Sequence, residues 1–178
     1  MNSNNYGIST AKRIALSGLL LALAVITLFF ATILPTGRLS LYALSSFFVS
    51  IVIIEFGIKN GWIFYIASCL LGTFIVQNKI GLVPFFVFFG VYGIVKFYIE
   101  KLKNIYFEYA VKIIYFSICL GSAFLFAVEF FMEDINISLP WWIIIAGLEI
   151  IFIVYDYIYT LFIQYYNSKL RKILGYKV

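Results

Sequence analysis

Long apolar runs, separated by short polar segments, organise the whole chain. Each run approaches the roughly 20 residues that a helix needs to cross a bilayer, and the segments between the runs hold turn residues and charges. No run alternates polar and apolar residues with a period of two, so a transmembrane β-barrel is excluded. The pattern predicts an all-α bundle of six transmembrane helices in one domain, 1–178, with spans at about 14–34, 39–57, 61–77, 80–98, 110–132 and 141–166.

The third run is shorter than the others and the connections around it are tight. Residues 35–38 and 77–79 have the composition of turns, and 58–61 is predicted to connect the second and third spans. The run at 62–76 would extend only about 22 Å as a helix, less than the ~30 Å hydrocarbon core. It must therefore be buried among its neighbours, extend through its turns or thin the bilayer locally.

Composition supports the membrane interpretation and narrows the chemistry. The chain is 64% hydrophobic and 12% charged, whereas soluble domains are about 45–50% apolar and about 25% charged. There is no histidine, the usual general base and commonest metal ligand. Cys69 and Cys119 lie inside apolar runs and are expected to be small buried residues. Phosphate loops, nucleophile elbows and metal motifs are absent, so we expect no enzyme, metal or cofactor.

The distribution of basic residues predicts the orientation. With the N-terminus inside, eleven of the thirteen Lys and Arg residues fall in or beside cytoplasmic segments, and only Arg38 and Lys79 lie outside. Such a bias sets membrane topology, so we predict N-in and C-in. The net charge of +5 then reflects topology and the lipid bilayer as partner, and nothing points to nucleic acid.

The sixth span carries two acids at bilayer depth, which is costly without a partner or a function. Counting from Trp141 at the outer interface, Glu149 lies about 12 Å deep and Asp156 about 22 Å deep, on one face of the helix. Lys96 lies about 24 Å along the fourth span, and Lys112 is near the inner end of the fifth. We predict a structural ion pair between Asp156 and Lys96 or Lys112.

Glu149 has no basic residue at its own depth. It is protonated, hydrogen-bonded to a Tyr or Ser, or in contact with a polar or cationic part of a ligand. A solute from outside would first meet Arg38, Lys79 and Asn78, which are otherwise ordinary turn residues. We therefore take Glu149, Arg38, Lys79 and Asn78 as substrate-binding candidates.

Small residues recur at spacings that let helices approach closely in membranes. Ala15, Gly18 and Ala22 share one face of the first span. The same kind of spacing occurs in the third and fifth spans, at Ser68 and Gly72 and at Ser117 and Gly121. These faces serve internal packing, or, in the first span, the docking of another membrane subunit.

Two stretches resemble the substrate-binding S components of energy-coupling factor (ECF) vitamin transporters. KRIALSGLLLALAVI is similar to the first helix of that family, and IVIIEFGIKNGWIFYIASCLLG resembles its turn between the second and third helices, where Gly57 and Gly61 bracket a basic residue. The resemblance implies a non-catalytic subunit of the bacterial cytoplasmic membrane that takes up a vitamin-like molecule from outside. A transmembrane coupling subunit, docked on Ala15, Gly18 and Ala22, and two ATPase subunits would drive transport.

A second hypothesis is a structural or scaffolding membrane protein, comparable in size and span number to the rod-shape protein MreD. The acids would then be packing pairs, and the basic C-terminal tail would bind partners or lipid. No ligand would be transported.

Overall fold

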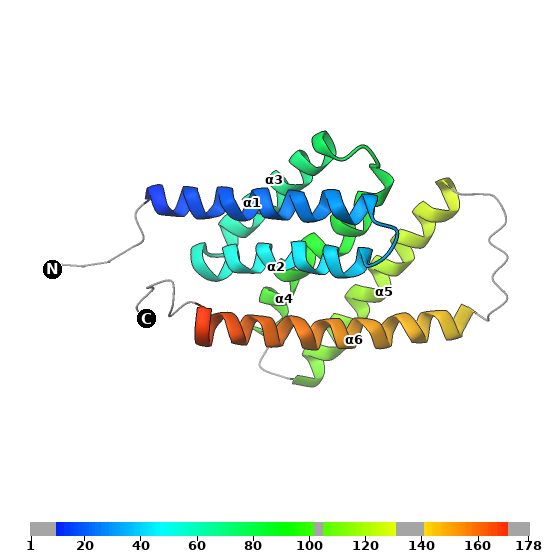
Figure 1. The fold of residues 1–178 in the computed structure, drawn as a ribbon. Helices are drawn as coiled ribbons and strands as arrows, with labels where there is room; N and C mark the ends of the chain where they lie inside the picture. Colours follow the sequence, from blue (N-terminus) through cyan, green and yellow to red (C-terminus); the bar gives the residue numbers. More distant parts are fainter. Residues whose placement is uncertain (1–9, 102–104, 131–140, 171–178) are drawn as a thin grey trace. The chain divides into compact units, whose positions relative to one another are not determined.

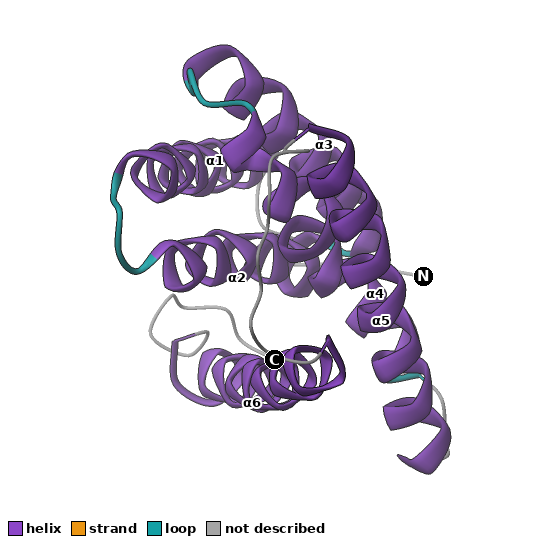
Figure 2. Cartoon of the chain, turned by 90° about the vertical axis from the view of Figure 1, so that its right-hand side faces the viewer, coloured by secondary structure: helices purple, strands orange, loops and turns teal. Residues whose placement is uncertain are grey.

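The structure, a computed structural model, describes residues 10–101, 105–130 and 141–170 (Figure 1). Every regular element among these residues is helical, and none is a strand, as Figure 2 shows. The all-α prediction is thus confirmed for the described part of the chain. The chain divides into two compact units between Leu82 and Val83.

Within the described residues, five helices are long and apolar enough to cross a membrane, which indicates a multi-pass protein in a lipid bilayer. They are Ala11–Ile33, Arg38–Phe56, Ile58–Ile75, Ile80–Ile99 and Ile145–Lys169. They correspond to five of the predicted spans. The remaining span, predicted at 110–132, overlaps helix α5 (Ile105–Phe130) and ends outside the described residues, as does the connection to the last span. The count of six and the orientation stay predictions.

The first unit consists of α1 (Thr10–Ile33), α2 (Arg38–Phe56), α3 (Ile58–Ile75) and a 3-10 turn, Ile80–Leu82. Helices α1 and α2 run side by side (Figure 1). The Ser45 hydroxyl of α2 donates to the Ala24 carbonyl of α1 at 3.3 Å, and the Tyr42 hydroxyl donates to the Gly81 carbonyl in the 3-10 turn. These hydrogen bonds link α2 to α1 and to the 3-10 turn, because polar side chains within a bilayer cannot form hydrogen bonds with water.

The connection between α1 and α2, residues 34–37, overlaps the turn predicted at 35–38, and Arg38 already belongs to α2. Gly37 has a φ of 75°, a left-handed conformation that glycine adopts without steric cost, and α2 begins at the next residue. The Arg38 guanidinium reaches back and donates from Nε to the Leu34 carbonyl at 2.9 Å. This bond satisfies a carbonyl at the end of α1 that has no partner within the helix.

The connection between α2 and α3 is shorter than predicted, because residues 58–61 are helical and not a loop. Gly57 alone separates the two helices, with a φ of 84°. Its N–H donates to the Ile53 carbonyl at 2.9 Å and its carbonyl accepts from Gly61 N–H at 3.1 Å, so one residue ends α2 and starts α3. Helix α3 therefore has 18 residues, about 27 Å, which is close to the hydrocarbon thickness.

Close packing of α2 against α3 depends on Gly61. A Cβ atom at this position would lie 2.4 Å from Cγ1 of Ile53, a buried side chain with little room to move. We expect Gly61→Ala to lower the free energy of unfolding by about 1–3 kcal/mol through overpacking. Thermal unfolding of the purified protein in detergent measures this.

Gly18→Ala is the matched control, because nothing lies within 4 Å of a Cβ atom at Gly18. We expect its unfolding free energy to stay within about 0.5 kcal/mol of the wild-type value. Equal destabilisation by the two substitutions would contradict the close α2–α3 contact.

The second unit begins with a helix whose first turns are irregular. Pro84 lacks an N–H, and the following residues, Phe85–Phe89, form a π-helical turn in which Gly90 N–H donates to the Phe85 carbonyl. Regular helix α4 (Gly90–Ile99) follows, and then α5 and α6 (Trp141–Tyr165), with a final π turn at Tyr166–Leu170.

Aromatic rings fill the interior of the second unit. The Phe116 ring of α5 stacks on the Phe152 ring of α6, with centroids 4.4 Å apart and planes 7° from parallel. Next to them, the Phe88 centroid lies 5.0–6.2 Å from the rings of Phe89, Tyr92, Tyr115, Phe116, Phe152 and Tyr155. We call Phe88 and these six residues the aromatic cluster; it joins the π turn, α4, α5 and α6.

Candidate functional site

Charged side chains of three helices meet beside the aromatic cluster. Helix periodicity places them, because residues four apart lie on one face. Helix α4 supplies Lys96, Glu100 directly follows its last residue, and α5 supplies Glu108 and Lys112. Helix α6 supplies Asp156, whose carboxylate lies between the two lysines.

Four of these groups form a closed ring of alternating charge, which we call the ion ring. Lys96 Nζ donates to Oδ1 of Asp156, and Lys112 Nζ donates to Oδ2 at 3.0 Å. Glu100 Oε1 closes the ring, 2.8 Å from Lys96 Nζ and 3.6 Å from Lys112 Nζ. Each lysine thus lies between two carboxylates, and each carboxylate between two lysines.

Further hydrogen bonds complete the coordination of both ammonium groups. Lys112 Nζ donates to Glu108 Oε1 at 2.7 Å, and Lys96 Nζ donates to the Thr160 hydroxyl at 2.8 Å. The Tyr92 hydroxyl donates to Oδ1 of Asp156. A carboxylate with several donors, and ammonium groups with several acceptors, are the arrangement that makes buried charges tolerable.

Burial differs sharply among the charged side chains that meet here. Lys96 and Lys112 are 1% and 3% exposed, whereas the side chains of Glu100 and Glu108 are 37% and 19% exposed. The Lys96 ammonium also lies 6.0 Å from the Tyr92 ring centroid and 5.8 Å from that of Tyr159, within range of a cation–π attraction. The lysines are therefore inside the unit, and the two glutamates cover them.

Sequence reasoning named Asp156, Lys96 and Lys112, and the structure brings these three together. The sequence prediction did not include Glu100, the fourth member of the ion ring, or the hydrogen-bond partners Tyr92, Glu108 and Thr160. Helical spacing was the available signal, since Tyr92 and Glu100 are each four residues from Lys96, and Thr160 is four from Asp156. The described residues contain no group of three His, Cys, Asp or Glu side chains able to hold a metal ion.

Glu149 lies two helical turns before Asp156 on α6 and has a different environment. The Ser117 hydroxyl of α5 donates to its Oε1 at 3.1 Å. Among the described residues, no Lys or Arg forms an ion pair with it. Glu149 is half-buried and belongs to the apolar span Ile145–Lys169, and its hydrogen-bond partner among the described residues is a neutral hydroxyl.

The other three substrate-binding candidates belong to the first unit, whereas Glu149 belongs to the second. Arg38 binds the Leu34 carbonyl. The Asn78 side chain accepts from Gly81 N–H at 3.1 Å and so shapes its own turn. Lys79 is exposed.

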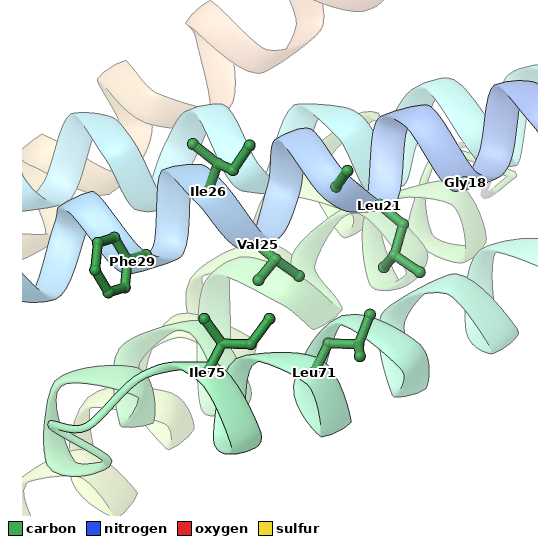
Figure 3. Close-up of a pocket in the computed structure, with 8 residues that line it drawn as sticks. Gly18, Leu21, Val25, Ile26, Phe29, Leu71 and Ile75 are labelled. Carbon is green, nitrogen blue, oxygen red and sulfur yellow. The ribbon is translucent and has the colours of Figure 1, made fainter.

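The small-residue face of α1 is not used for packing within its unit. Ala15 and Ala22 are exposed, and a Cβ atom at Gly18 would meet nothing within 4 Å. Gly18 and Ala22 instead line an apolar groove between α1 and α3 (Figure 3). In α3, by contrast, Ser68 and Gly72 are both buried.

No protein-family model, curated protein or solved structure matches the chain.

Proposed function

We propose that the chain is the membrane-embedded substrate-binding subunit of a small-molecule uptake transporter, with six spans, both termini inside and no catalysis of its own. The environment of Glu149 is the observation that supports this proposal most directly. It is a carboxyl group at the depth of the apolar spans whose described partner is a hydroxyl and not a cation. An ionisable group in that position is rarely kept without a function.

The contrast with Asp156 supports the proposal. Asp156 is surrounded by two lysines and a tyrosine of its own unit, so it has little capacity for a ligand. Glu149 has capacity for a polar or cationic group that enters from outside. Arg38, Lys79 and Asn78 are the outer residues that we expect such a solute to meet first, and Ala15, Gly18 and Ala22 form the face that we expect to contact a coupling subunit.

The test is a comparison of co-purified small molecules. The wild-type protein and Glu149→Gln are purified in detergent, and the bound molecules are identified and quantified by mass spectrometry. We expect Glu149→Gln to retain at least about tenfold less of a molecule bound by the wild type, since a hydrogen bond to a charged group contributes about 1.5–3 kcal/mol.

Two controls separate ligand binding from stability. Glu55→Gln changes another acid of a predicted span, in the first unit, and should leave retention unchanged. Ser117→Ala removes the partner of Glu149 but keeps the acid. If Glu149→Gln lowers the unfolding temperature and leaves the bound molecules unchanged, Glu149 is a packing residue and the proposal fails.

The ion ring favours a second candidate, a scaffolding membrane protein without a transported ligand. Its buried lysines are matched by carboxylates of the same unit, as expected of a rigid structural bundle. A wild-type protein that purifies without any small molecule and without ATPase subunits would support this alternative.

A further inference from the structure

The groove between α1 and α3 is apolar throughout. It has a volume of about 440 Å³ and is lined on the α1 side from Gly18 to Phe29 and on the α3 side by Leu71 and Ile75. Figure 3 shows Val25 of α1 and Ile75 of α3 on its facing walls. Because both helices are apolar enough to cross a membrane, the groove lies at the depth of the acyl chains.

The length of the groove is that of one leaflet. Gly18 and Phe29 are eleven residues apart, which corresponds to about 16 Å along the helix. Half of the ~30 Å hydrocarbon core is about 15 Å. One extended acyl chain would therefore fill the groove from end to end.

Cationic side chains gather at the Gly18 end of the unit. The Arg13 guanidinium lies 5.8 Å from the ring centroid of Phe56, the last residue of α2. This contact brings the start of α1 close to the start of α3, which carries Lys59. Lys12, Arg13 and Lys59 are all exposed, and Glu55 is the acid at this end. Arg13 precedes Gly18 by about 8 Å of helix, about one and a half turns, so it lies beyond the end of the groove.

We propose that this groove binds an anionic phospholipid. One acyl chain lies along α1 from Gly18 to Phe29, and the phosphate-bearing headgroup is held by Lys12, Arg13 and Lys59. The groove is apolar along its length, with three exposed cations beyond its Gly18 end against Arg38 and Lys79 beyond its Phe29 end. A lipid has the same division between a charged headgroup and an apolar chain. Basic residues next to a membrane attract anionic headgroups in this way.

This proposal does not depend on the uptake function. The bound lipid would nevertheless affect the uptake function, because it would cover Gly18 and Ala22, two of the three residues expected to dock a coupling subunit. A subunit that docks there must displace the lipid.

The experiment uses the full-length protein in neutral detergent and native mass spectrometry. The protein is titrated with phosphatidylglycerol, with phosphatidylcholine of the same acyl chains, and with glycerol 3-phosphate as a headgroup without chains. We expect phosphatidylglycerol to bind at least about fivefold more tightly than either of the others. Lys12→Gln and Lys59→Gln should each weaken it about fivefold, since a basic residue near an anionic lipid contributes about 1 kcal/mol.

Gly18→Leu tests the groove itself, because the leucine side chain would occupy the space of the acyl chain. We expect it to weaken phosphatidylglycerol binding at least tenfold. Gly121→Leu is the matched control, since Gly121 also has nothing within 4 Å of a Cβ atom but lies on α5. Ala22→Leu blocks the same groove and replaces Gly18→Leu if that variant does not fold.

Four results would overturn the proposal. Equal binding of the two phospholipids would remove the headgroup preference. Binding of glycerol 3-phosphate as tight as that of phosphatidylglycerol would assign the cations to a free phosphate ester. Undiminished lipid binding by Gly18→Leu and Ala22→Leu would place the lipid elsewhere. A co-purified membrane protein that Gly18→Leu releases, with lipid binding unchanged, would make the groove a protein interface.

Discussion

Asp156→Ala is expected to lower the free energy of unfolding by about 3–5 kcal/mol, the usual cost of removing one partner from a buried ion pair. The substitution leaves Lys96 and Lys112 inside the second unit without the carboxylate that they share. Denaturation of the purified protein in mixed micelles, followed by tryptophan fluorescence, measures the change. Glu149→Ala, on the same helix and without a described ion pair, should cost about 1 kcal/mol.

A double variant distinguishes the charge effect from simple loss of packing. In Lys96→Met with Asp156→Leu, a lysine and its acid are replaced together by apolar side chains, and Lys112 keeps Glu108 at 2.7 Å. We expect this variant to recover at least half of the stability lost in Asp156→Ala, because paired apolar replacement of buried ions is often neutral. A double variant no more stable than Asp156→Ala would show that the ion ring does not determine the stability of the unit.

Phe152→Ala has the second largest expected effect, a loss of about 3–5 kcal/mol. The Phe152 ring is buried, stacks on Phe116 and packs against Phe88, so its removal leaves a cavity in the centre of the aromatic cluster. The same unfolding measurement applies. Ile153→Ala, at the next position, changes a side chain that is 48% exposed and should cost less than about 1 kcal/mol. Similar losses for both variants would argue against the aromatic cluster as the core.

The contacts of Asp156 with Lys96 and Lys112 could be predicted because each helical residue adds a fixed rise, so the position of a residue in its span gives its depth. At about 1.5 Å per residue, Lys96 and Asp156 fall within a few ångströms of the same level when counted from the outer ends of their spans. Apolar periodicity and turn composition likewise predicted the helical fold. The helices and the residue depths depend on local geometry, which can be inferred directly from the sequence.

Other features depend on conformation or on partners distant in sequence. The single-residue joint at Gly57 requires a positive φ, whereas composition alone indicated a loop at 58–61. Glu100 and Glu108 lie between the spans predicted at 80–98 and 110–132. Each is four residues from a lysine, and only the 3.6 Å approach of Lys112 to Glu100 requires α4 and α5 to pack together. The aromatic cluster could not be predicted from the sequence, because aromatic residues are frequent along the whole chain and those of the cluster do not stand out.

The ion ring has a consequence for how the chain is made. Lys96 and Lys112 leave the ribosome 60 and 44 residues before Asp156. Until α6 is synthesised, each lysine can pair with the glutamate four residues away, and Lys112 also with Glu100 once α4 and α5 pack together. If α4 and α5 both cross the bilayer, as the sequence predicts, these pairs partly neutralise the two lysines during insertion. Asp156 of α6 contacts both lysines, so a chain truncated before α6 would lack the residue that links the three helices of the second unit.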